Sequence, residues 1–425
     1  MLSIEDNEYL TKIGPGTPMG TLFRRYWMPF LMSSELPGPD CDPLRVRLLG
    51  EDLVAFRDTN GNVGLLDNYC PHRRASLFFG RNEECGLRCV YHGWKFDVDG
   101  NCVDMPSEPA ESNFKDKVHV TSYPTQDWGG VLWAYLGPQD QTPELPQLEW
   151  ARVPEDHRFV TKRRQETNWA QGVEGGVDSS HVSFLHRVFA DVQEMKAGKD
   201  GFLVQRPIYM IQDKSPKFFV RDTPYGFAIG ARRNAEEGHY YWRFSQVMMP
   251  AYTIIPSAAG RYLTGHAWVP IDDENCWAFT FSWHPDRPLT EEELEIFRAG
   301  DQNHAVVDPI TFRNFANADN DYLIDREMQR NYNYTGVRGV GTQDTAIQES
   351  MGPITGRSKE HLGTSDTAMI YWRRLMIDLA KAVMDGAEAR GAKDGEAYRI
   401  RGGAMVLPHD ADPFETSRTE LLATS

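Results

Sequence analysis

The chain has 425 residues, of which 40% are hydrophobic and 25% charged, so it is long enough for about two or three domains with their own cores. Its formal net charge of −16 argues against nucleic acid as a partner, because phosphate binding needs a basic surface. No stretch approaches the roughly 18 apolar residues of a membrane span, and residues 1–8 do not resemble a signal peptide. The sequence therefore predicts a cytoplasmic protein that does not bind membranes.

The first two parts of the chain are an N-terminal segment and a small β domain. Residues 1–40 begin with polar, helical sequence, and we expect this segment to pack on the C-terminal part of the chain. Residues 41–155 alternate short strand-like runs with turn signals, which predicts an antiparallel β domain. The runs are 45–49, 53–57, 63–66 and 131–136, and the turns are Asn60-Gly61 and Asp99-Gly100.

Residues 156–425 form the third part, in which the predicted elements are longer. Several aromatic-rich strands are expected within residues 201–284, with helices before and after them. Strands and helices that are segregated along the chain are typical of an α+β fold. The expected strands include 240–249 and 262–269, and the expected helices are 178–190, 291–299 and 368–387.

Two cysteine–histidine pairs, Cys70-Pro-His72 and Cys89-Val-Tyr-His92, form the most informative pattern. Two interpretations compete: a structural zinc ion, or a [2Fe–2S] cluster with both cysteines on one iron and both histidines on the other. A zinc finger would present two cysteines close together and then two histidines. The order found here, with Gly80, Gly86 and Gly93 available for tight turns, instead matches the Rieske pattern and predicts a [2Fe–2S] centre.

Six cysteines in a long chain that is expected to be cytoplasmic favour metal ligation or burial over a disulfide framework. The four outside the Rieske pattern, Cys41, Cys85, Cys102 and Cys276, are expected to be buried apolar side chains. The chain has no convincing GxGxxG motif or P-loop. Any NADH or flavin chemistry must therefore come from a separate protein.

A second group of metal-binding candidates lies between Asn168 and His186. Its Asp178-x-x-His181 and His186 suggest the 2-His-1-carboxylate chemistry that leaves open positions on Fe(II). On an ideal helix the two histidines would point about 140° apart. They could share a metal only if the helix is distorted or the metal lies against its flank, so the spacing alone is weak evidence.

Taken together, the two patterns resemble the α subunits of the Rieske non-haem iron oxygenases, over nearly the whole chain. The matching residues that follow the Rieske segment are Asn168, Trp169, Glu174, Asp178, His181 and His186. The resemblance implies a Rieske β domain followed by an antiparallel sheet, covered by helices that carry a mononuclear Fe(II).

The resemblance also implies a role for each metal-site residue. His181 and His186 would bind the mononuclear iron, and Asp178 would bridge that site to a cluster, where it could fix the tautomers of histidines on both sides. The cluster ligands would be Cys70, His72, Cys89 and His92.

The third iron ligand depends on the register of that resemblance. Asp344 lies five residues before Glu349, as the family's metal carboxylate does, and is therefore favoured. Asp366 is the next candidate, followed by Asp321 and Asp325. Without the family register, a helix cap or an exposed position is the ordinary role for such an aspartate.

Two arginines are candidates for substrate binding. Arg206 lies on an otherwise apolar face of a predicted strand over 202–210, with Phe202, Val204, Ile208 and Met210, where an unpaired charge is costly to bury. Arg243 lies among aromatic residues in a second predicted strand. Two such arginines suit an aromatic carboxylate, although each could instead pair with a structural acid.

Residues 348–357 and 359–366 resemble the phthalate dioxygenase branch of the family, with Gly356 where an acid is expected. This resemblance implies cis-dihydroxylation of phthalate with O2, with Arg206 and Arg243 on its carboxylates. It further implies electrons from a separate NADH-dependent flavin and iron–sulfur reductase, and a homotrimer or stacked trimers (a hexamer).

Two alternatives remain open at the level of sequence. A Rieske monooxygenase or O-demethylase that acts on a substituted aromatic acid would keep every metal ligand. A Rieske protein that only transfers electrons would not need the long segment that carries His181 and His186.

Overall fold

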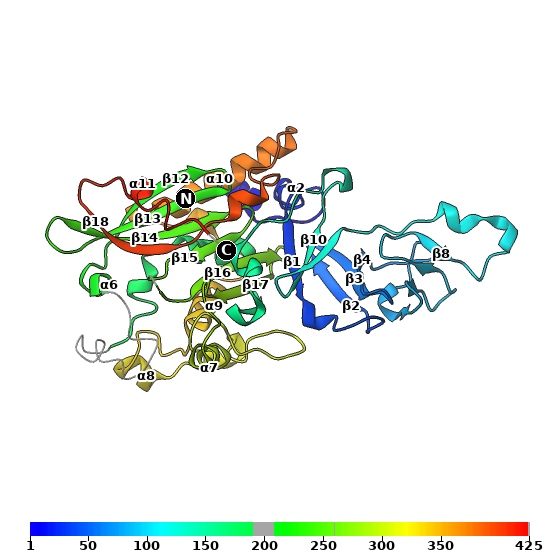
Figure 1. Ribbon diagram of the computed structural model, residues 1–425, viewed down its shortest axis with the longest axis horizontal. Coiled ribbons are helices and arrows are strands. Elements are labelled where there is room, and N and C mark those ends of the chain that lie inside the picture. Colours follow the sequence, from blue (N-terminus) through cyan, green and yellow to red (C-terminus); the bar gives the residue numbers. More distant parts are fainter. Residues whose placement is uncertain (190–207, 259, 424–425) are drawn as a thin grey trace.

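The computed structural model describes residues 1–189, 208–258 and 260–423. Its N-terminal and C-terminal halves lie next to each other along the long axis, with β8 near one end and the large sheet toward the other (Figure 1). The N-terminal half contains three small sheets, and the C-terminal half contains one sheet of eight strands. This is the predicted α+β arrangement.

The small sheets of the N-terminal half are antiparallel and confirm the expected strands and turns. Gly61 and Gly100 adopt positive φ angles of 86° and 87° in the two predicted turns, which glycine tolerates best. The strands are β1 (Trp27–Met32), β2 (Leu44–Leu48), β3 (Glu51–Arg57), β4 (Val63–Asp67), β5 (Arg81–Asn82), β6 (Leu87–Arg88), β7 (Lys95–Phe96), β8 (Cys102–Asp104), β9 (Thr125–Trp128) and β10 (Val131–Tyr135).

The N-terminal half has two separate hydrophobic cores. One is local to the Rieske segment and includes Phe56, Leu77 and Phe96 together with Cys70 and Cys89. The other is continuous with the core of the C-terminal half, because β1 and β10 pack their buried side chains against it. The cysteine-bearing loops therefore have a core of their own, away from the large sheet.

The large sheet is antiparallel, in the order β11-β17-β16-β15-β14-β13-β12, with β18 paired to β14. The expected strands 240–249 and 262–269 correspond to β14 and β16 and are confirmed. The bounds are β11 (Arg158–Gln165), β12 (Lys217–Thr223), β13 (Gly226–Asn234), β14 (His239–Met248), β15 (Tyr252–Ile255), β16 (Leu263–Pro270), β17 (Cys276–Trp283) and β18 (Gly403–Pro408).

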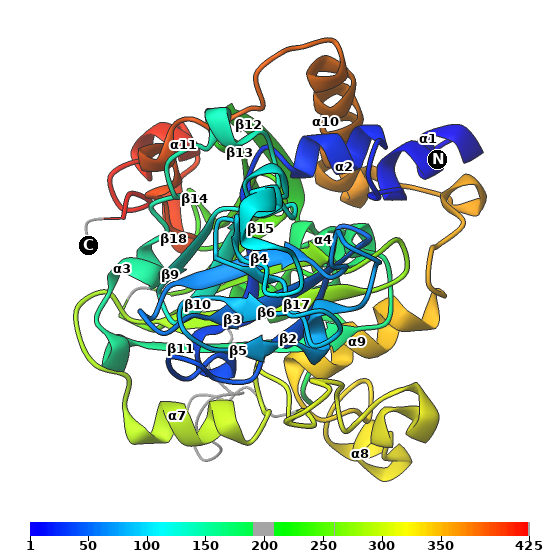
Figure 2. The same cartoon turned by 90° about the vertical axis from the view of Figure 1, so that its right-hand side faces the viewer.

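Helices from both ends of the chain surround this sheet. The expected helices 291–299 and 368–387 are confirmed as α7 and α10, and α1 and α2 lie against α10 (Figure 2). Within the described ranges, no helix has both the length and the apolarity needed to span a bilayer. The helices are α1 (Ile4–Thr11), α2 (Pro18–Phe23), α3 (Glu149–Arg152), α4 (Trp169–Val177), α6 (Ile208–Gln212), α7 (Glu291–Arg298), α8 (Arg326–Asn331), α9 (Val340–Ser350), α10 (Thr367–Met384) and α11 (Pro413–Thr416).

Helix α4 lies unusually close to the sheet because glycines form the face that meets it. A Cβ atom on Gly172 would lie 2.1 Å from Cδ1 of Trp268, and one on Gly176 would lie 2.6 Å from Cη2 of the same ring. Asn168 caps the helix by accepting from the Ala170 N–H and donating to the Thr11 carbonyl. The helix is therefore held both at its start and along its face.

We expect Gly172→Ala to destabilise the protein by about 1–3 kcal/mol, the usual cost of overpacking, against the roughly 1 kcal/mol that alanine gains in helix propensity. Urea unfolding followed by circular dichroism measures this change. Gly38→Ala is the control, because no atom lies within 4 Å of the added Cβ. Equal stability of both variants and the parent would contradict the close approach.

Candidate metal centres

The two predicted cluster loops meet in the structure. Cys70 and Cys89 are 2% and 3% exposed, and the rings of His72 and His92 lie 4.4 Å apart between centroids. His72 also stacks on Trp94, with centroids 4.3 Å apart. The four side chains thus come from two short hairpin loops, after β4 and after β6.

The atoms of these loops fit a two-iron cluster. The Nδ1 atoms of His72 and His92 are buried without a hydrogen-bond partner, which is costly unless a ligand satisfies them. Among the described residues, the only group of three or more possible metal ligands within 4.8 Å of one another is His181, His186 and Asp344, so the four cluster residues do not converge on one point. A single zinc ion would need such convergence, whereas a [2Fe–2S] cluster binds the thiolates and the imidazoles on different irons.

The other cysteines match the expectation only in part. Cys102 and Cys276 are buried, at 7% and 0% exposure, and their burial confirms the prediction. Cys41 and Cys85 are half-exposed, so the prediction was wrong for these two. Cys85 lies in the turn between β5 and β6 with a positive φ of 59° and accepts a hydrogen bond from Asn60, so its side chain is part of a surface turn.

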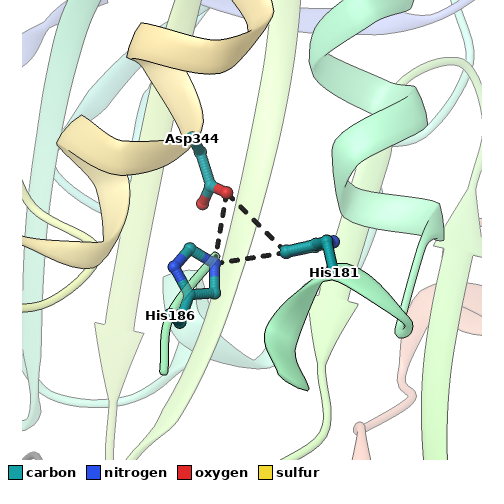
Figure 3. Close-up of side chains that lie close together, drawn as sticks. All are labelled: His181, His186 and Asp344. Carbon is teal, nitrogen blue, oxygen red and sulfur yellow. Dashed lines mark hydrogen bonds and ion pairs between the residues drawn. The ribbon is translucent and has the colours of Figure 1, made fainter. Parts of the chain in front are cut away.

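The second group of candidates also converges (Figure 3). Nε2 of His186 lies 3.2 Å from Nε2 of His181 and 3.2 Å from Oδ1 of Asp344, and the remaining edge of the triangle is 3.7 Å. Metal bonds of about 2.0–2.2 Å to nitrogen and oxygen place neighbouring ligand atoms roughly 3 Å apart. The three atoms therefore fit one metal ion with open positions.

The helix expected over 178–190 is wrong for the part that the structure describes. Helix α4 ends at Val177, and a single 3-10 turn over His181–Ser183 follows. Because the chain leaves the helix between Asp178 and His186, the two imidazoles are free of the roughly 140° separation that a helix would impose. This break allows both rings to face Asp344.

Asp178 holds the first of these imidazoles. Its carboxylate accepts from the backbone N–H of Ser180 at 2.6 Å and of His181 at 3.2 Å, and lies 3.3 Å from His181 Nδ1. Burial alone would raise the pKa of Asp178, but these hydrogen bonds and the charge of His181 outweigh burial and keep the pKa below its ordinary value. An ionised carboxylate on Nδ1 leaves Nε2 of His181 to face the other two groups.

The structure brings Asp344, and none of the other three aspartates, to the two histidines. Asp325 caps α8 by accepting from the N–H groups of Glu327 and Met328, and Asp366 accepts from the N–H of Gly363. Burial would raise the pKa of Asp344, but the charges of His186 and His181 lower it to about 2.

A cavity of about 220 Å³ lies between these groups and the large sheet. Arg243 lines it from β14, with its NH1 group 2.9 Å from the sulfur of Met210 and its Nε buried without a partner. Within the described part of the chain, Arg243 forms no ion pair with an acid. The described residues therefore give no support to the alternative that Arg243 pairs with a structural Asp or Glu.

The other members of the predicted substrate strand have different outcomes. Arg206, Phe202 and Val204 lie outside the described residues. Ile208 and Met210 belong to helix α6, so the strand prediction was wrong for them. The strand was inferred only from the alternation of apolar residues. A short helix can carry the same apolar side chains, so alternation over a few residues does not distinguish the two.

Two further cavity residues were missed by the sequence analysis. Arg163 on β11 is buried and donates to the hydroxyls of Thr345 and Thr280. Burial, with Arg163 nearby, lowers the pKa of His266 on β16 to about 3, so this imidazole is neutral at neutral pH. In the sequence Arg163 stands between two other basic residues, so the pattern does not indicate which of the three side chains is buried.

Comparisons with known proteins agree with this architecture. A Rieske [2Fe–2S] domain model matches residues 26–124, and a model described as LigXa C-terminal domain like matches residues 134–412. The fold also matches the terminal oxygenase of carbazole 1,9a-dioxygenase from Nocardioides aromaticivorans IC177, with a TM-score of 0.57, 20% identity, and coverage of 88% of this chain and 98% of that one.

Two curated relatives extend along almost the whole chain. The phthalate 4,5-dioxygenase oxygenase subunit of Pseudomonas putida is 42% identical over 97% of this chain and 94% of its own length. The 3-chlorobenzoate-3,4-dioxygenase oxygenase subunit of Comamonas testosteroni is 37% identical over 98% of each. The chain therefore belongs to the Rieske non-haem iron oxygenases, as the oxygenase component of a multicomponent oxidoreductase that uses a [2Fe–2S] cluster and a mononuclear iron.

Proposed function

We propose that this oxygenase cis-dihydroxylates phthalate or a similar aromatic carboxylate, with O2 and with electrons from a separate NADH-dependent reductase. The observation that carries the proposal is the state of Arg243, a cation that lines the cavity beside His181, His186 and Asp344 with its Nε unsatisfied. A substrate carboxylate would supply the missing acceptor. The names of both extended relatives also specify aromatic carboxylates.

In this proposal each metal has its own set of ligands. The cluster would be held by Cys70, His72, Cys89 and His92, and the mononuclear iron by His181, His186 and Asp344. When bound, the cluster supplies single electrons and the iron activates O2. Asp178 would orient His181 and, being about a third exposed at its side chain, would also accept from a cluster histidine of a neighbouring subunit.

The remaining side chains would position the substrate. Arg243, together with Arg206, would fix the carboxylates and so turn the ring toward the metal ligands. His266, neutral and with an unpartnered Nδ1, adds no charge to this wall. The positive charge of Arg163 lies on the same cavity and partly balances Asp344.

We further propose a head-to-tail homotrimer, either alone or with trimers stacked into a hexamer. The cluster loops belong to the part of the chain with the small sheets, whereas α9, which carries Asp344, lies beside the large sheet (Figure 1). The trimer would bring the cluster of one subunit to the iron site of its neighbour. Exposed apolar side chains lie at both places: Val90 and Tyr91 on a cluster loop, at 58% and 55%, and Phe184 and Tyr334 near the iron histidines, at 46% and 47%. A heterologous contact between two such patches gives a closed ring when the rotation that relates neighbouring subunits is a simple fraction of a full turn.

The proposal also includes the domain bounds and the cellular location of the protein. We assign residues 1–40 to a helical segment on the catalytic domain, 41–155 to the Rieske domain and 156–425 to the catalytic domain, although β1 of the first segment pairs with β10 of the second. A cytoplasmic location is supported by six cysteines without a disulfide.

Single-turnover product analysis tests the reaction. Reduced, iron-loaded protein is mixed with phthalate and isotopically labelled O2, and we expect a cis-dihydrodiol that carries both labelled atoms. Methoxybenzoates are the matched comparison. Formaldehyde from methoxybenzoates with no diol from phthalate would favour the O-demethylase alternative, and no product from any aromatic acid would overturn the proposed substrate class.

The metal assignment predicts the outcome of His181→Ala. We expect this variant to lose the mononuclear iron and its turnover while it keeps the absorbance of the cluster, because the cluster ligands lie in a separate core. Iron per chain, measured by mass spectrometry, checks this. His409→Ala, at an exposed histidine that stacks on Tyr240, is the control. Unchanged iron content in His181→Ala would refute the assignment.

The substrate assignment predicts the outcome of Arg243→Gln. Hydrogen bonds to charged groups contribute roughly 1.5–3 kcal/mol, so we expect phthalate to bind about 10- to 100-fold more weakly. The affinity for the neutral phthalamide should fall much less. Titration calorimetry measures both, with Arg232→Gln as the control, because Arg232 covers Tyr240 at 4.1 Å. Equal losses for phthalate and phthalamide would argue against a carboxylate partner.

A further inference from the structure

Gln343 stands immediately before Asp344 on α9 and is 6% exposed. Its Oε1 lies 2.7 Å from Nδ1 of His186, and its Nε2 donates to the carbonyl of Val337 at 2.8 Å. Because the Val337 carbonyl can only accept, it takes the NH2 end of the amide. The oxygen end of Gln343 therefore faces His186.

This contact determines which nitrogen of His186 carries the proton. An amide oxygen accepts and cannot donate, so the proton of His186 must lie on Nδ1. In the neutral imidazole, which is the form that binds a metal, the other nitrogen, Nε2, then presents a free lone pair. That is the nitrogen that lies 3.2 Å from both His181 Nε2 and Asp344 Oδ1.

The two histidines are therefore oriented by different chemical groups. His181 has the carboxylate of Asp178 at 3.3 Å from its Nδ1, whereas His186 has a neutral amide. A second cavity of about 530 Å³ touches both Gln343 and His186 on this side. Its charged side chains are Glu292, Glu295, Asp301 and Arg338, of which the last two form an ion pair.

We propose that Gln343 is a positioning residue for the mononuclear iron, which holds His186 in the Nδ1–H form with its Nε2 toward the metal. The inference rests on the proposed function, in which His186 is an iron ligand. Removal of such a partner typically lowers metal affinity about 10- to 100-fold. Without Gln343, Nδ1 of His186 would face the second cavity, where solvent has no fixed orientation.

The test uses Co²⁺ as a probe in the full-length protein, from which the mononuclear iron has been removed by chelation while the cluster is kept and oxidised. Equilibrium dialysis gives the Co²⁺ affinity, and electron paramagnetic resonance reports the ligand field of the bound ion. We expect Gln343→Leu to weaken Co²⁺ binding by about 10- to 100-fold and to change the spectrum. Gln343→Glu keeps an acceptor oxygen for His186 Nδ1 but loses the donor to the Val337 carbonyl, so it should restore part of the affinity.

Gln302→Leu is the matched control, because Gln302 lies in the wall shared by both cavities and has no hydrogen bond to a metal-site histidine in the described structure. Its Co²⁺ affinity and spectrum should equal those of the parent. Parental affinity and spectrum in Gln343→Leu would overturn the proposal, as would an equal loss in Gln343→Glu. If Gln343→Leu fails to fold, as judged by circular dichroism, Gln343→Met replaces it.

His186→Ala separates the two levels of inference. If His186→Ala binds Co²⁺ as the parent does, the proposed iron site itself is wrong. If His186→Ala loses Co²⁺ while Gln343→Leu keeps it, only the role of Gln343 is rejected.

Discussion

A buried ion network around Glu174 fixes the helix on which the iron site depends. Arg357 and Arg373 each place Nε 2.7 Å from Oε1 of Glu174, and their side chains are 0% and 2% exposed. Burial alone would raise the pKa of Glu174, but the two guanidinium groups outweigh burial and keep the pKa below its ordinary value. Removal of one partner from such a network leaves an uncompensated charge and costs about 3–5 kcal/mol. The acid of the sequence motif is thus structural, and it holds α4 one turn before Asp178.

The two metal centres are assembled in different ways. The cluster loops belong to neighbouring hairpins with a small core of their own, so their geometry is mostly local. The proposed iron site instead joins segments that are far apart in the chain, since His186 and Gln343 are 157 residues apart. Its geometry therefore depends on the whole catalytic domain, including α4 against β16 and the network around Glu174.

This difference explains what the sequence could predict. Most of the strands, the hairpin turns and the cluster loops follow from local patterns, and the structure agrees with them, except where the expected strand over 202–210 is helix α6 at Ile208–Gln212. The helix predicted over 178–190 was wrong because the chain leaves α4 at Asp178 so that both histidines can face Asp344. The periodicity of apolar residues does not reveal such a break. Asp344 could be chosen only from the resemblance to the family, because the two histidines that it faces are far from it in the sequence. Arg163, His266 and Gln343 were missed because strand and helix packing, rather than sequence spacing, brings them to the cavity.

The cavity walls have a consequence for how substrate range can change. The proposed metal ligands lie in the turn after α4 and on α9, whereas Arg243 and His266 line the cavity from β14 and β16. The glycine face of α4 fixes the distance between these walls. Side chains on the strands can therefore be exchanged, by evolution or by design, without relocating the iron. The same metal site can then act on different aromatic acids, with substrate selectivity set by the side chains on the opposite wall of the cavity.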